Sequence, residues 1–130
     1  RDTALEYLNL YNYDIIILDI MGVNGFDLLK KTVVKGIPTV ILTAHALSAD
    51  TLRMSLKGGA VFYVPKDRIM DIEEILAEVI NSAGRPVWAK LFGRFASYFS
   101  KRFRWTREDE EEIMKEIEET LKGERIVDTG

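Results

Sequence analysis

The chain has 130 residues, of which 47% are hydrophobic, and a formal net charge of −3. A chain of this size and composition can bury an ordinary core in one domain, or in one domain with an appendage, and is not of the disordered class. The absence of cysteine excludes disulfides and thiol chemistry and fits a reducing compartment, and a single histidine argues against a histidine-based metal site. No apolar run reaches the roughly 18 to 20 residues of a membrane span, so we expect a cytoplasmic protein.

The first segment, residues 3–11, predicts an amphipathic helix. Its apolar and aromatic residues lie three and four positions apart, as in Leu5, Leu8 and Tyr11. Because this pattern starts with the first residues, we expect that an upstream part of a longer protein precedes it.

Residues 13–19 predict a strand in the interior of a parallel sheet. Ile15, Ile16 and Ile17 are consecutive β-branched residues, and the run ends at a carboxylate, Asp19. A strand that is buried on both faces has no polar alternation. Ligands collect at the carboxyl ends of such strands, which makes Asp19 the first functional candidate. The alternative is that Asp19 only caps the following turn.

After Asp19 the pattern alternates between helix and strand. The predicted helices span 26–34, 48–57 and 72–80, and the predicted strands span 39–43 and 60–64. Gly36 ends the first helix, Ser48 caps the second, and Asp71 with Glu74 forms a capping pair for the third. In the second helix we expect Met54 to face inward with its leucines. This alternation implies parallel strands joined by right-handed crossovers.

Three polar residues follow or end three successive predicted strands: Asp19, Thr43 and Lys66. Neighbouring parallel strands are about 4.8 Å apart, so a carboxylate, a hydroxyl and an ammonium group converge at one edge of the sheet.

The stretches YDIIILDIMGVNGFDLL, IPTVILTAHA and GGAVFYVPKD resemble the receiver domain of two-component response regulators. Over residues 1–82 this resemblance implies a flavodoxin-like α/β fold, with a parallel sheet covered by helices on both faces. It also implies a signalling module rather than an enzyme, in which a histidine kinase or phosphotransfer protein phosphorylates Asp19. Thr43 and Tyr63 would be the switch residues, and Lys66 would correspond to the lysine of the receiver site. Mg²⁺ would be held by Asp19 and the backbone carbonyl of Met21.

The sequence also departs from the receiver pattern. The acidic pair that receivers carry after their first strand is absent from this chain, and Pro65 precedes Lys66 instead of following it. We therefore expect weak Mg²⁺ binding or none, and the alternative function is a phosphorylation-independent receiver-like module for interaction or dimerisation. A Schiff-base enzyme that uses Lys66 is a further alternative, but no neighbouring residue selects it. Because the first two receiver strands are missing, strand 13–19 would have an open apolar edge, which favours self-association there or a cover from the C-terminal helices.

Residues 83–130 predict a helical extension after a hinge at Ala83–Pro86. A basic, aromatic helix is expected at about 87–104. The stretch from Arg85 to Arg107 contains seven Lys or Arg residues and no acid, so the rest of the chain has a net charge of −10. It could pack on the receiver or on a second copy, lie on an anionic membrane surface, or contact nucleic acid, which the short basic stretch does not favour. An acidic helix follows at about 107–122, started by Thr106 with Asp109 and ended by Gly123.

Overall fold

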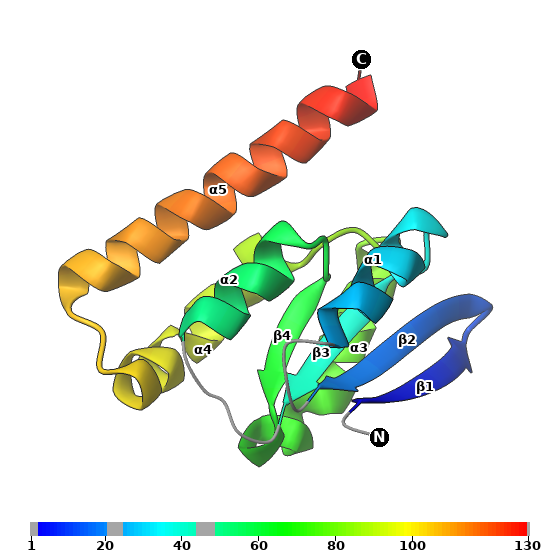
Figure 1. Cartoon of the computed structure of the whole chain (residues 1–130), viewed down its shortest axis with the longest axis horizontal. Helices are drawn as coiled ribbons and strands as arrows, with labels where there is room; N and C mark the ends of the chain where they lie inside the picture. The colour runs from blue at the N-terminus through cyan, green and yellow to red at the C-terminus, as the bar shows by residue number, and fades with distance from the viewer. Residues whose placement is uncertain (1–2, 21–24, 44–48, 130) are drawn as a thin grey trace. The chain divides into compact units, whose positions relative to one another are not determined.

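The computed structural model describes the backbone of residues 3–20, 25–43 and 49–129, and the side chains of 5–20, 25–43 and 49–122 (Figure 1). The chain divides into two compact units, Arg1–Val87 and Trp88–Gly130, which we call the N-terminal and C-terminal units.

The N-terminal unit is a four-stranded mixed sheet with helices on both faces. Its strands are β1 (Thr3–Leu10), β2 (Tyr13–Ile20), β3 (Thr39–Thr43) and β4 (Phe62–Pro65), in the order β1-β2-β3-β4. Its helices are α1 (Phe26–Val34), α2 (Ala49–Lys57), the short 3-10 segment η2 (Lys66–Asp71) and α3 (Ile72–Asn81). Strands β2, β3 and β4 are parallel, and Figure 1 shows α1 and α2 on one face of the sheet and α3 on the other. The α/β class is therefore confirmed, whereas the all-parallel sheet is wrong, because β1 runs antiparallel to β2.

Strand β1 replaces the helix that the spacing of residues 3–11 predicts. Tyr11 and Asn12 have φ angles of 52° and 67°, and Leu10 pairs with Tyr13 across them. Two successive residues with positive φ form the two-residue hairpin loop that best matches strand twist. The prediction failed because apolar spacing over so few residues suits either element, and pairing with β2 decided the outcome. Since β2 is paired on both sides, the expected open edge along residues 13–19 was also wrong.

The core follows the predicted buried runs. Ile15, Ile16, Ile17 and Leu18 of β2 are at most 7% exposed, and every residue of β3 and β4 is buried. Burial of one aliphatic side chain contributes about 1.5–3 kcal/mol, so these central strands form the most stable part of the unit.

The helix boundaries are only partly as predicted. Gly36 adopts φ +77° and its amide donates to the Val33 carbonyl at 2.9 Å, so it ends α1 as expected. The inward position of Met54 is wrong, because that side chain is 39% exposed. The capping role of Asp71 is also wrong, since its carboxylate accepts a hydrogen bond from Arg68 Nε at 2.9 Å and makes no cap bond. Ser48 lies outside the described residues.

The C-terminal unit consists of α4 (Trp88–Phe103) and α5 (Arg107–Thr129). Phe99 lies at the centre of an aromatic cluster, with its ring centroid 5.5 Å from that of Phe92 and 6.0 Å from that of Phe103. The predicted capping pair is confirmed at the start of α5. The Asp109 amide donates to Thr106 Oγ1 at 3.1 Å, and the Thr106 amide donates to Asp109 Oδ2 at 2.9 Å.

Helix α5 does not end at Gly123 but continues to Thr129. A glycine inside a helix costs only about 1 kcal/mol relative to alanine, which a long helix can absorb. Over the part of the chain that the structure describes, none of the helices combines the length and apolar character needed to cross a bilayer.

Candidate functional site

Asp19 and Lys66 meet at the carboxyl edge of the sheet. Lys66 Nζ lies 2.7 Å from Asp19 Oδ2, and the two side chains are 42% and 26% exposed. An ammonium–carboxylate contact of this length is a charge-assisted hydrogen bond that solvent can still reach. This ion pair is the centre of the candidate site.

The strand register explains why these two side chains reach each other. Asp19 is paired with Leu42 of β3, and Leu42 with Val64 of β4. Paired residues of parallel strands face the same side of a sheet, and Lys66 follows Val64 by two positions. The backbones of β2 and β4 are two strand spacings apart, roughly 10 Å. The long side chain of Lys66, the shorter one of Asp19 and the 2.7 Å contact between them together bridge this distance across the end of β3.

The second carboxylate oxygen of Asp19 is in an unusual position for a charged group. Asp19 Oδ1 is buried and has no hydrogen-bond partner among the described residues. A buried acceptor without a partner costs about 1–3 kcal/mol, and more when it is charged. Such a group is typical of sites that are kept for function and not for stability.

This unpaired oxygen is of the donor type that Mg²⁺ prefers, but the site offers few further ligands. Within the described ranges, no group of three or more acidic or histidine side chains is placed to hold a metal ion. The β1 residue paired with Asp19 is Ala4, which brings no carboxylate. Met21, the expected carbonyl ligand, lies outside the described residues. Asp19 could therefore contribute one ligand to Mg²⁺, with phosphate and water as the others.

Thr43 and Tyr63 lie on the other face of the sheet from Asp19. Thr43, 7% exposed, pairs with Ile20, which is one position past Asp19 and so faces the opposite side. Tyr63 pairs with Ile41, two positions before Thr43, and so shares its face. Both side chains therefore lie on the same face at neighbouring strand ends.

The hydroxyl of Tyr63 connects the sheet to α2. The ring is 1% exposed, and its oxygen shares a hydrogen bond with Thr51 Oγ1 at 2.9 Å. Sequence reasoning missed Thr51, because a single threonine in a helix gives no signal of a buried partner. Tyr63 thus already occupies the interface with α2.

The pKa shifts lie at the far end of β2, away from the candidate site. The Tyr7 hydroxyl hydrogen-bonds the Asp14 carboxylate and lowers the pKa of Asp14, and the same contact raises the pKa of Tyr7. Asn9 Nδ2 also donates to Asp14 Oδ1 at 2.7 Å. These exposed groups stabilise the hairpin pairing of β1 with β2 and are not part of the site.

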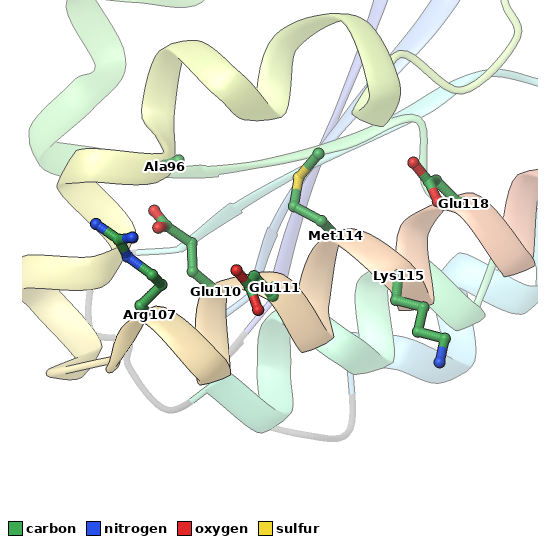
Figure 2. A pocket seen from close by; sticks show the side chains of 7 residues that line it. All are labelled: Ala96, Arg107, Glu110, Glu111, Met114, Lys115 and Glu118. Atoms are coloured by element: carbon green, nitrogen blue, oxygen red, sulfur yellow. The ribbon is translucent and has the colours of Figure 1, made fainter.

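A charged hollow of about 610 Å³ lies in the C-terminal unit (Figure 2). Ala96 of α4 and six residues of α5 line it: Arg107, Glu110, Glu111, Met114, Lys115 and Glu118. Three acids and two bases largely compensate one another there, and Glu110 also accepts a hydrogen bond from Ser100 Oγ at 3.0 Å. We assign no chemistry to this hollow.

Helix α4 has the two faces that its sequence predicts. Phe92, Phe95 and Phe99 are at most 4% exposed, whereas Lys101 and Arg102 are exposed. The rings of these three residues contact one another within the C-terminal unit.

No family model, curated protein or solved structure matches this chain.

Proposed function

We propose that this chain is a receiver-like phosphoacceptor module of two-component signalling, with Asp19 as the phosphorylated residue. The observation that carries the proposal is the 2.7 Å contact between Lys66 Nζ and Asp19 Oδ2, beside a second carboxylate oxygen that is unpaired among the described residues. In this interpretation β2, β3 and β4 correspond to the last three strands of a flavodoxin-like receiver. Strand β1 takes the place of the first receiver strand, in the opposite direction.

The chemistry needs a nucleophile and a means of balancing charge. A carboxylate oxygen of Asp19 bonds to the phosphorus of a phosphohistidine in the partner kinase or phosphotransfer protein. The P–N bond breaks, its electrons stay on the imidazole, and the product is an acyl phosphate. The Lys66 ammonium, which already contacts the carboxylate, offsets the negative charge that the phosphoryl group brings. Mg²⁺, when bound, would neutralise charge on the phosphoryl oxygens.

The readout would pass through Thr43 and Tyr63. A phosphoryl group at Asp19 offers oxygen acceptors to a hydroxyl donor. Thr43 ends β3 with its side chain on the other face of the sheet, so it would have to turn toward the carboxyl edge to donate to them. Tyr63 is its neighbour on the same face and is hydrogen-bonded to Thr51 of α2. A shift of Thr43 would therefore change the packing of Tyr63 and, through Thr51, the position of α2. We propose that this takes place in the cytoplasm.

Phosphate uptake tests the proposal. The chain is incubated with phosphoramidate and MgCl₂, and intact-mass spectrometry counts phosphoryl groups before and after hydroxylamine, which cleaves acyl phosphates. We expect one hydroxylamine-labile phosphoryl group, its loss in Asp19→Asn, and a lower yield in Lys66→Met. Asp71→Asn is the matched control, because Asp71 also pairs with a cation at 2.9 Å but lies outside the site. No uptake by the unmodified chain, or equal uptake by Asp19→Asn, would contradict the proposal.

The second candidate function is a receiver-like interaction module that takes no phosphate. It is favoured because the described residues place no group of three or more acidic or histidine side chains to hold a metal ion, whereas receivers use an acidic pair for it. This candidate predicts no phosphoryl group at any Mg²⁺ concentration, together with binding of a partner that Asp19→Asn leaves unchanged.

A further inference from the structure

An apolar groove lies between α1 and α2 in the N-terminal unit. Its volume is about 570 Å³, and its lining comes from successive turns of the two helices, Phe26, Leu29 and Lys30 on α1 and residues 50, 53, 54 and 57 on α2. We call it the α1–α2 groove. The spacings of three, four and seven residues place each set on one helix face.

The floor of the α1–α2 groove is apolar. Leu29 and Phe26 are almost fully buried, whereas Met54 is 39% exposed. The absence of a side chain at Gly58 allows close approach there, since a Cβ atom would lie 2.8 Å from Leu29 Cδ2. A flexible methionine exposed on an otherwise buried apolar floor is typical of surfaces that contact other proteins.

The rim of the groove is positively charged. Lys30 contributes one cation from α1, and Arg53 and Lys57 contribute two from α2, against a single acid, Asp50. The whole chain, by contrast, has a net charge of −3. Complementary potentials select partners and speed their encounter, so this rim favours an occupant with negative charge beside its apolar surface.

We propose that the α1–α2 groove binds an amphipathic helix of another protein, with an apolar stripe flanked by Asp or Glu. Helix-in-groove recognition uses apolar anchors at i, i+3, i+4 and i+7 that enter such a groove. Helices of nine residues are about 13.5 Å long, so the groove accommodates two to three turns of a partner helix. The floor of the groove is open at Met54, so the groove suits a helix better than it suits a small molecule, which would need an enclosed cavity. The proposal does not depend on phosphorylation of Asp19.

Fluorescence anisotropy with synthetic peptides tests this proposal on the whole chain. The probe is a labelled, lactam-bridged helical peptide of about 18 residues, a length near the limit for a stable isolated helix, with a leucine stripe flanked by Glu. The matched peptide has Lys in place of each Glu. We expect the Glu peptide to bind and the Lys peptide to bind at least about tenfold more weakly. Added salt should weaken binding of the Glu peptide.

Two adjacent lysines provide a matched pair of variants. Lys30→Glu reverses a rim charge and should weaken binding of the Glu peptide about tenfold. Lys31→Glu makes the same change one residue along α1, outside the groove lining, and should leave binding of the Glu peptide unchanged. Met54→Asp should abolish binding. Circular dichroism checks that each variant folds, and amide chemical shifts of the unmodified chain locate the peptide without any substitution.

Four results of the peptide experiments would each overturn the proposal. They are no binding of the Glu peptide, equal binding of both peptides, equal effects of Lys30→Glu and Lys31→Glu, and shift changes that avoid α1 and α2. If the chain formed a dimer and Met54→Asp dissociated it, the groove would bind a second copy of the chain. This result would also reject the proposal of a partner helix.

Discussion

Replacing Asp19 with alanine should stabilise the N-terminal unit even though it removes an ion pair. The Oδ1 atom is buried and has no hydrogen-bond partner within residues 5–20, 25–43 and 49–122, which costs about 1–3 kcal/mol. The pair with Lys66 is partly solvated, since the lysine is 42% exposed, and contributes about 0–1 kcal/mol. Alanine keeps the Cβ atom and removes both terms. The difference between the middles of these two ranges is about 1.5 kcal/mol, so we expect the free energy of unfolding to rise by about that amount while phosphate uptake is lost.

Urea unfolding followed by circular dichroism measures this change. With a slope of about 1–2 kcal/mol per molar urea, the midpoint should rise by roughly 1 M. Asp71→Ala is the control, because Asp71 forms an ion pair of 2.9 Å with similar exposure but has no buried unpaired oxygen. It should lose at most about 1 kcal/mol. A fall in stability of Asp19→Ala that equals or exceeds that of the control would refute the reasoning, because Oδ1 would then be satisfied in the native state.

Three further predictions concern other parts of the structure. Tyr63→Phe and Thr51→Val should each lower the free energy of unfolding by about 0.5–1.5 kcal/mol, with a coupling near 1 kcal/mol in a double-mutant cycle, and additive effects would contradict their hydrogen bond. The Tyr7 hydroxyl lowers the pKa of Asp14. This hydrogen bond therefore stabilises the folded state above the unfolded pKa of about 3.9, and the stabilisation is lost as pH falls through the lower folded pKa. Asp14→Asn should therefore flatten the acid limb of a plot of urea midpoint against pH, and an unchanged limb would exclude this contact. Thr106→Ala should cost about 1 kcal/mol and lower the helix signal of α5 in circular dichroism, because Thr106 accepts an amide hydrogen bond of the first turn, and an unchanged signal would argue against the cap.

Much of the sheet could be predicted from local sequence. The isoleucine run of β2 and the apolar run of β3 are buried as expected, because a strand without polar alternation has no face to present to water. The positions of Asp19 and Lys66 at strand ends follow from the same pattern, since consecutive parallel strands bring their carboxyl ends to one edge. The capping pair of Thr106 and Asp109 could be predicted from four consecutive residues.

Only the tertiary structure decided the rest. Whether residues 3–10 form a helix or a strand depended on pairing with the next strand, β2, through backbone hydrogen bonds that side-chain spacing within the segment does not encode. The same holds for Thr51, whose partner Tyr63 is distant in the sequence, and for the unpaired Asp19 Oδ1, whose burial depends on several elements. The sequence by itself determined that Asp19 and Lys66 reach the carboxyl edge, because strand periodicity is local, whereas the expected convergence of Thr43 with them was wrong, since Thr43 faces the other side of the sheet. The fold decided which of those groups are paired, because pairing depends on contacts between segments far apart in the chain.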